Sequence, residues 1–236
     1  MKNSNYTEHH AGNVIILTAG ILTSAIGLLA MIGWILHLPL LASFGAQLIP
    51  MAPSTASLFI LLGIALSLRS RLPLYRGTYF AGLSIGVLVA VTGLLLFISS
   101  LAGTYPGIEH LGFSIPNTLY GIQIGHMSSV TAISYAACAL AFLLTLSQSV
   151  EHSKRAWIAL VLAFSIVLNW SLFLFAYLLV TPLMYGGGIV PPSLPTSLAF
   201  LFLGIGLFMS AGLQVWPYHR IKDAAITRVS YVLLLI

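Results

Sequence analysis

Four long runs without a charged side chain dominate this sequence. Residues 9–68, 77–108, 110–150 and 156–219 contain no Asp, Glu, Lys or Arg. Only 6% of the 236 residues are charged, whereas about a quarter of the residues in soluble domains are. Because a helix needs about 20 apolar residues to cross the hydrocarbon core, the outer two runs have room for two crossings each and the inner two for one each. The sequence therefore predicts an all-α, polytopic membrane protein with six spans.

The apolar segments divide the chain into an N-terminal tail at 1–12, a six-helix domain at 13–213, a connection at 214–228 and an apolar end at 229–236. That end is about 12 Å of helix, which is under half a membrane. It either lies on the surface or begins a truncated seventh helix, and the second reading is favoured because Arg228 precedes it like the start of an outward crossing. The expected spans are 14–36, 53–68, 77–100, 127–147, 156–180 and 193–213.

All nine basic residues fall on one side of these expected spans. The loops on the other side, at 37–52, 101–126 and 181–192, contain no Lys or Arg and a single acid, Glu109. Cytoplasmic loops are enriched in Lys and Arg, so we expect a multi-pass membrane protein with a cytoplasmic N-terminus. The basic residues are Lys2, Arg69, Arg71, Arg76, Lys154, Arg155, Arg220, Lys222 and Arg228.

The even-numbered spans contain a repeat built on a threonine. In each one an aromatic residue follows the threonine by four positions, and a small residue follows by eight. These positions drift only slowly around a helix, so they form one stripe. The sequence therefore predicts three helical hairpins, at 14–68, 77–147 and 156–213. The stripes are Thr55, Phe59 and Gly63; Thr131, Tyr135 and Ala139; and Thr196, Phe200 and Gly204.

The stripes have two interpretations. In the first, the small residues let helices pack closely and each threonine caps its helix N-terminus. In the second, three helix N-termini converge on one outward-facing region, where their partial positive charge holds a small anionic or carbonyl-bearing ligand. On that reading the threonines and aromatic residues are candidate ligand-binding residues.

Four further residues are candidate ligand contacts. His37 and His126 lie at outer helix ends and form, with Glu109, the titratable cluster of that side, which is either an ordinary interface or a ligand-, haem- or proton-sensing site. Asn169 is the most polar residue in mid-membrane and needs a hydrogen-bond partner there. Tyr185 lies in a Gly-rich loop from Thr181 to Pro192 before the sixth span, which is either a plain connector or a re-entrant gate or pocket rim.

Several chemistries are not expected. The hydrocarbon segments contain no ionisable Asp, Glu, Lys or Arg, whereas proton- and ion-coupled transporters usually bury such a group on their pathway. The one cysteine, Cys138, excludes an intramolecular disulfide. We predict no catalytic residues, no metal site and no nucleic-acid partner, and the sequence names no cofactor.

Several short sequence segments resemble those of a known protein family. The chain resembles the multi-pass N-terminal region of bacterial sensor histidine kinases and diguanylate cyclases, which precedes PAS-type and transmitter domains. The resemblance covers nearly the whole chain and implies a sensor input in the bacterial inner membrane, whose ligand is generally undefined. The phrases are Ile49-Pro-Met-Ala-Pro-Ser-Thr-Ala with Leu61-Leu-Gly-Ile-Ala-Leu, Gly125-His-Met-Ser-Ser-Val-Thr-Ala, and Tyr185-Gly-Gly-Gly with Pro195-Thr-Ser-Leu-Ala-Phe-Leu-Phe-Leu-Gly.

The expected function is therefore a non-enzymatic sensory input module of a two-component or cyclic-di-GMP signalling protein. It would transmit a ligand or membrane-state signal by helix repacking. The expected partners are the lipid bilayer, a small hydrophobic or anionic ligand, the cytoplasmic PAS or transmitter domains of a longer protein and, as a candidate, a second copy of the chain. The alternatives are a small permease or carrier, for which internal repeats are also common, and a structural subunit of a membrane complex.

Overall fold

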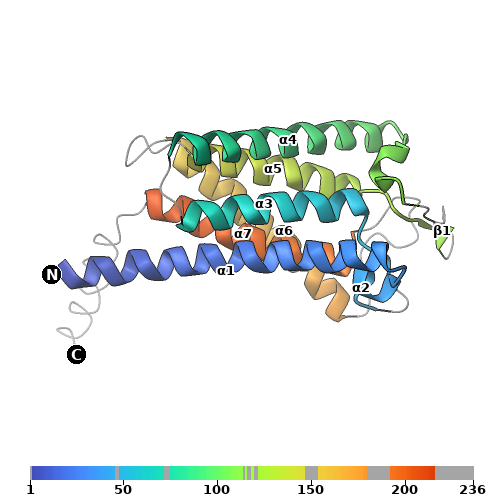
Figure 1. Ribbon diagram of the computed structural model, residues 1–236, viewed down its shortest axis with the longest axis horizontal. Coiled ribbons are helices and arrows are strands. Elements are labelled where there is room, and N and C mark those ends of the chain that lie inside the picture. The colour runs from blue at the N-terminus through green and yellow to red at the C-terminus, as the bar shows by residue number, and fades with distance from the viewer. Residues whose placement is uncertain are drawn as a thin grey trace, which may run out of the picture.

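The structure of this chain is a bundle of six long helices. It is a computed structural model that describes residues 2–45, 48–71, 75–113, 115, 118–119, 122–146, 154–179 and 192–215. The long helices are α1 (Lys2–Ile35), α3 (Pro53–Arg71), α4 (Arg76–Leu101), α5 (Ser129–Leu146), α6 (Lys154–Leu178) and α7 (Leu194–Val215). Figure 1 shows them side by side along the long axis. Each contains a segment long and apolar enough to cross a membrane, which confirms the expected polytopic helical fold.

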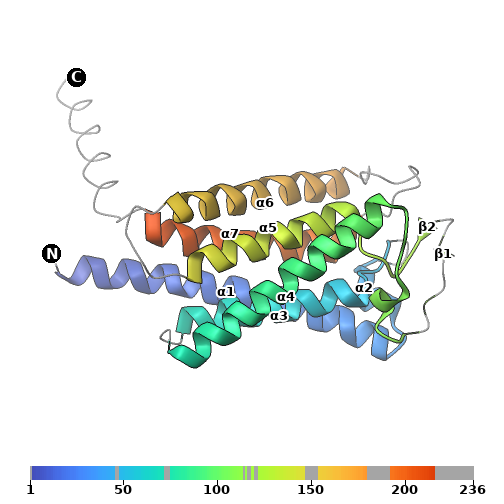
Figure 2. The same ribbon diagram turned by 90° about the horizontal axis from the view of Figure 1, so that it is seen from above.

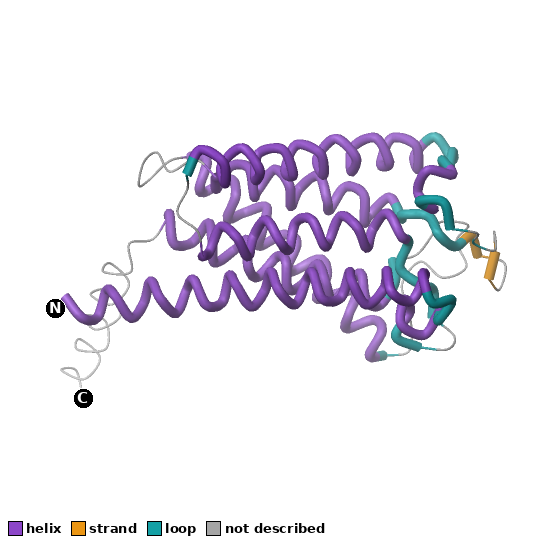
Figure 3. The backbone as a smooth tube through the Cα atoms, viewed as in Figure 1, coloured by secondary structure: helices purple, strands orange, loops and turns teal. Residues whose placement is uncertain are grey.

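Short elements occupy one end of the bundle. The short helix α2 (Pro39–Ser43) and the 3-10 helix η1 (Gly107–His110) follow α1 and α4. Strands β1 (Thr118–Leu119) and β2 (Ile122–Gln123) pair antiparallel and lie beyond the helices, at the end opposite the N-terminus (Figure 3). Two-residue strands of this kind leave the all-α class unchanged.

The first helix departs from the expected boundaries. It begins at Lys2 rather than near residue 14, so the expected N-terminal tail is a helical continuation of the first span. The tail contains no proline, and once a helix has nucleated, each added residue gains a backbone hydrogen bond at little further cost. The other helices start and end within three residues of the expected positions. The expected seventh span at 229–236 lies outside the described residues.

The helices form an inner and an outer layer. In α3, α5 and α7, 56%, 56% and 61% of the membrane-spanning window is buried, against 39%, 28% and 33% in α1, α4 and α6. Every outer helix packs against the inner helix of its own hairpin and against that of the preceding hairpin, and α1 closes the ring by packing on α7. This cyclic pattern gives the bundle approximate threefold symmetry. Figure 2 shows one step of it, with α5 lying between α4 and α6.

The two ends of the bundle differ in charge. The inner helices begin at the end that carries His37, His110 and His126, here called the histidine end. The opposite end, here called the arginine end, carries every described Lys and Arg, while Arg220, Lys222 and Arg228 lie outside the described residues. That the arginine end faces the cytoplasm stays a prediction. The basic residues described there are Lys2, Arg69, Arg71, Arg76, Lys154 and Arg155.

Glycines set the closest approaches within two hairpins. A Cβ added at Gly27 of α1 would lie 2.7 Å from the carbonyl oxygen of Ala56, and one at Gly93 of α4 would lie 2.9 Å from that of Ala132. Ala56 and Ala132 each follow the repeat threonine by one position, so the two contacts are equivalent. Such close backbone approach is how helices associate in lipid, where no hydrophobic effect operates between them.

We predict that Gly27→Ala and Gly93→Ala each destabilise the bundle by about 1–3 kcal/mol, because the added methyl group would meet backbone rather than a movable side chain. Thermal or SDS-induced unfolding of the purified protein measures the change. Gly77→Ala is the matched control, because a Cβ there meets nothing within 4 Å. Equal stability of all three variants would contradict the prediction.

Candidate functional site

The repeat aromatics meet on the axis of the bundle. Phe59 of α3, Tyr135 of α5 and Phe200 of α7 are each fully buried. Their ring centroids form a triangle with sides of 4.9 Å for Phe59–Tyr135, 4.7 Å for Phe59–Phe200 and 4.8 Å for Tyr135–Phe200. Tilted and edge-on contacts at such distances are favourable for aromatic pairs. The aromatic triangle therefore fills the centre of the inner layer and joins all three hairpins.

Two hydrogen bonds fix α5 beside this triangle. The Tyr135 hydroxyl donates to the Thr55 carbonyl oxygen of α3 at 2.6 Å. Trp170 of α6, stacked on Phe200 at 4.5 Å, donates its ring N–H to the Ser134 hydroxyl at 3.1 Å. Both donors are buried, so without these bonds each would lose its hydration uncompensated. The bonds thus specify the arrangement of α3, α5 and α6 as well as stabilising it.

The repeat threonines are not the N-cap residues that the capping interpretation assumed, because they lie inside the first turn of their helices. Thr55, Thr131 and Thr196 are the third residues of α3, α5 and α7, and all are buried. In α5 and α7 the capping residue is the serine three positions earlier. Ser128 accepts from the Thr131 backbone N–H at 3.1 Å, and Ser193 from that of Thr196 at 3.4 Å. The threonine hydroxyl bonds to the capping serine, at 2.8 Å and 2.7 Å respectively.

The first repeat lacks this cap. Ala52 stands at the position of the capping serines, and Pro53 follows as the first helical residue. Proline has no N–H to satisfy there and its φ already suits a helix, so α3 starts without a side-chain cap. In α5 and α7, one N-terminal amide is already bonded to serine. The ligand-binding interpretation of the three N-termini stays a prediction, with fewer free amides than the sequence indicated.

The structure does not bring the remaining candidate ligand-binding residues together in one site. Asn169 is half-buried, and the buried hydrogen bond between α6 and α5 comes from its neighbour Trp170. His37 follows α1 as an exposed residue with φ of 55°. Tyr185 and its Gly-rich loop lie outside the described residues.

A titratable cluster lies at the histidine end. Glu109 of η1 is only 3% exposed, and its carboxylate accepts the Met127 backbone N–H at 2.5 Å. Its other oxygen lies 3.3 Å from Nδ1 of His126. The His126 ring contacts those of His110 and Tyr105, with centroids 4.6 Å and 5.2 Å away. His126 therefore joins Glu109 as expected, but the other members are His110 and Tyr105, and His37 is not among them.

Backbone geometry brings His110 into this cluster. Gly125 has a backbone φ of 82°, which residues other than glycine rarely adopt, and a Cβ there would lie 3.0 Å from Nε2 of His110. A glycine at this position both permits the turn and leaves room for the imidazole. The Nε2 atom of His110 is buried without a hydrogen-bond partner. The sequence held a signal for this site, because Glu109 is the only acid in the three expected loops, but it did not show which histidine would reach it.

Burial shifts the proton affinities of the cluster. Desolvation raises the pKa of Glu109 to about 7, and the Met127 N–H bond opposes part of that rise. Burial lowers the pKa of His126, and burial together with the nearby His126 lowers that of His110. The carboxyl of Glu109 therefore titrates near neutral pH while both imidazoles are mostly neutral.

Nothing outside the chain identifies this site. The described residues include no group of three or more His, Cys, Asp or Glu side chains that could hold a metal ion. No family model, curated protein or solved structure matches the chain. The function of the chain is therefore inferred from its own residues and geometry.

We predict that Tyr135→Phe destabilises the protein by about 0.5–1.5 kcal/mol, because it keeps the ring triangle but removes the hydrogen bond that the hydroxyl donates to the Thr55 carbonyl oxygen. Thermal unfolding in detergent measures the loss. Tyr79→Phe on the surface of α4 is the matched control and should leave the melting temperature unchanged. A Tyr135→Phe variant as stable as the wild type would show that the bond adds nothing net.

We predict that Glu109→Gln stabilises the protein at pH 8 and not at pH 4.5. The folded state holds the Glu109 proton more tightly than the unfolded state, so the wild type loses stability as the pH rises from about 4.5 to about 7. A rise of this size corresponds to at most about 3 kcal/mol.

The measurement is the difference in unfolding free energy between wild type and variant across that pH range. Taking the difference removes the opposite trend of the histidines, which lose stability below about pH 6.5. His37→Gln serves as control and should leave the profile unchanged. A difference that is independent of pH would refute the assignment.

Proposed function

We propose that this chain is the membrane-embedded sensory input module of a bacterial signal-transduction protein, such as a histidine kinase or a cyclic-di-GMP enzyme. The resemblance of its sequence segments to the membrane region of bacterial sensor proteins and its all-helical membrane fold support this role. The observation that carries the proposal is the position of Glu109, a buried carboxyl bonded to the backbone directly before α5. A change in its protonation acts on the start of an inner helix.

Charge at Glu109 has a defined effect on α5. An ionised carboxylate near a helix N-terminus is stabilised by the helix dipole, and the protonated form is not. Met127, its backbone partner, immediately precedes the capping Ser128. η1 also packs against the start of α3, whose only charged residues, Arg69 and Arg71, lie at the other end. Among the described residues, the titratable group in contact with Glu109 is His126, whose ring in turn contacts Tyr105 and His110.

A continuous set of contacts leads from this site to the core. From Ser128, α5 continues to Tyr135, which bonds to Thr55 of α3 and touches Phe200 of α7. A displacement of the start of α5 therefore reaches all three inner helices. In the proposed mechanism, protonation or a ligand at the Glu109 cluster shifts the bundle between two packings, and the arginine end conveys the shift to an output domain.

The carrier alternative has less support from the geometry. Carriers built from repeats bind their substrate in mid-membrane, and proton-coupled ones usually hold an ionisable group there. In this bundle the aromatic triangle occupies the centre, and the six described spans contain no Asp or Glu. The interior therefore favours transmission by helix packing over passage of a solute.

We predict a pH-dependent change in distance between spin labels at Arg71→Cys of α3 and Lys154→Cys of α6, in a Cys138→Ala background. Both label sites are exposed and lie at the arginine end, while Cys138 is buried. Pulsed electron resonance in nanodiscs at pH 5.5 and pH 8 should give two different distance distributions. Glu109→Gln should give the same distribution at both pH values, and His37→Gln should keep the wild-type response.

An unchanged distribution in the wild-type background would overturn signalling by this route. Solute flux into proteoliposomes containing the purified chain would favour the carrier instead. Such flux should be tested with the same Glu109→Gln variant, since a carrier that does not use Glu109 would be unaffected by it.

A further inference from the structure

Arg69 is a partly buried cation with one buried nitrogen that has no described partner. It lies in the last turn of α3, and its Nη1 atom is buried without a hydrogen bond. The one acidic side chain whose surroundings the structure describes, Glu109, lies at the opposite end of the bundle. A guanidinium nitrogen that is buried without an acceptor costs free energy, so an anion that reaches Nη1 would gain a charge-assisted hydrogen bond.

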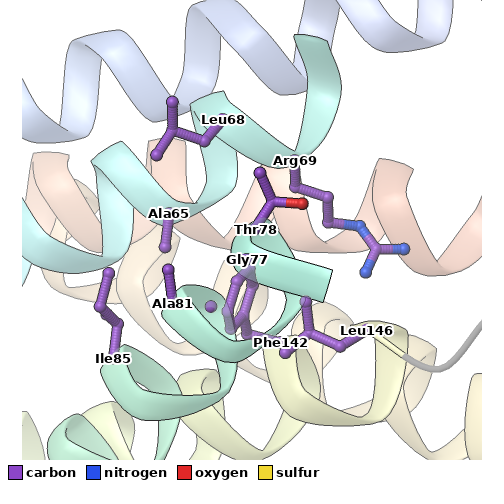
Figure 4. Close-up of a pocket in the computed structure, with 10 residues that line it drawn as sticks. Ala65, Leu68, Arg69, Gly77, Thr78, Ala81, Ile85, Phe142 and Leu146 are labelled. Atoms are coloured by element: carbon purple, nitrogen blue, oxygen red, sulfur yellow. The ribbon is translucent and has the colours of Figure 1, made fainter. Parts of the chain in front are cut away.

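A cavity of about 150 Å³ adjoins this arginine. It lies between α3, α4 and α5 at the arginine end, and Figure 4 shows the side chains that line it. Its wall is mostly apolar, with Ala65, Ala81, Phe142 and Leu146 among the lining residues. Cavities of this size hold about one benzene ring, so a head group or the first carbons of an acyl chain fit. Ala81 is exposed, which leaves the cavity open toward the surrounding bilayer.

The N-terminus of α4 lines the same cavity. Its first turn contributes Gly77 and Thr78, and no side chain caps it. The N–H of Gly77 has no acceptor within the helix, and a Cβ at Gly77 would meet nothing within 4 Å. An anion can therefore approach this backbone, where the partial positive charge of the helix adds to that of Arg69.

We propose that this cavity, here called the Arg69 cavity, binds the oxyanion head group of an anionic membrane amphiphile. A phosphate or carboxylate oxygen would accept from Nη1 of Arg69 and from the Gly77 N–H of α4, and the first carbons of the chain would lie against Phe142 and Leu146. The apolar wall selects an amphiphile over free phosphate. This site is distinct from the Glu109 cluster and does not depend on the signalling role.

Native mass spectrometry of the purified full chain tests this site. In a non-ionic detergent, the wild type should retain dioleoyl phosphatidylglycerol in preference to dioleoyl phosphatidylcholine. Arg69→Gln should weaken phosphatidylglycerol binding by about tenfold, as expected for loss of one charged hydrogen bond. Arg71→Gln is the matched control, because it removes the same charge from an exposed position two residues along α3.

A second variant separates the two parts of the site. Ala81→Leu fills the apolar opening without changing charge, so it should weaken phosphatidylglycerol binding while leaving the melting temperature near that of the wild type. Inorganic phosphate, tested by thermal shift, should stabilise the wild type far less than phosphatidylglycerol does.

Two results would overturn the proposal. Equal losses in Arg69→Gln and Arg71→Gln would indicate general attraction of anionic lipid to a basic surface. Stabilisation by inorganic phosphate that matches phosphatidylglycerol, with Ala81→Leu unaffected, would indicate a free-oxyanion site instead. If Arg69→Gln fails to fold, Ala81→Leu still decides between these outcomes.

Discussion

The contact of three aromatic rings on the axis is the constraint on which the rest of the bundle depends. Lipid tails are as apolar as leucine, so helices in a bilayer associate through close packing and polar contacts rather than through burial of apolar surface. Phe59, Tyr135 and Phe200 provide both, because they interlock at under 5 Å and one of them donates a hydrogen bond to a neighbouring helix. The outer helices then pack around this centre in a cyclic order.

Much of this architecture could be predicted from the sequence because it follows from periodic features. Charge-free runs predicted the six helices, and the threonine stripes predicted which helices face the axis. The threonine cap was misplaced because Ser128 and Ser193 stand at the caps of α5 and α7 but Ala52 stands there in α3. Because the repeat was aligned on the threonine that all three copies share, the alignment did not reveal the capping serine that only two copies have. The early start of α1 was missed because its tail has no apolar periodicity.

The candidate site was less predictable because it is built from a loop. Glu109 and His126 are seventeen residues apart, and their pairing depends on η1, on the turn at Gly125 and on the approach of His110. None of these leaves a periodic pattern in the sequence. Asn169 shows the same limit within a helix, since its side chain is half-buried while the adjacent Trp170 makes the buried bond. Residue type indicated that α6 needed a polar contact, but only packing decided which residue provides it.

The Glu109 cluster and the Arg69 cavity lie at opposite ends of the same two helices. Glu109 is bonded directly before α5 and packs near the start of α3, while Phe142 of α5 and Arg69 of α3 line the cavity. Between them, Tyr135 joins α5 to α3 through its bond to Thr55. Coupling between two sites requires an element with two arrangements that both sites bias. In the proposed mechanism the position of α5 relative to α3 is such an element, because both helices contact both sites. An anionic lipid and a proton could therefore act on one equilibrium from opposite faces of a membrane, without a solute crossing it.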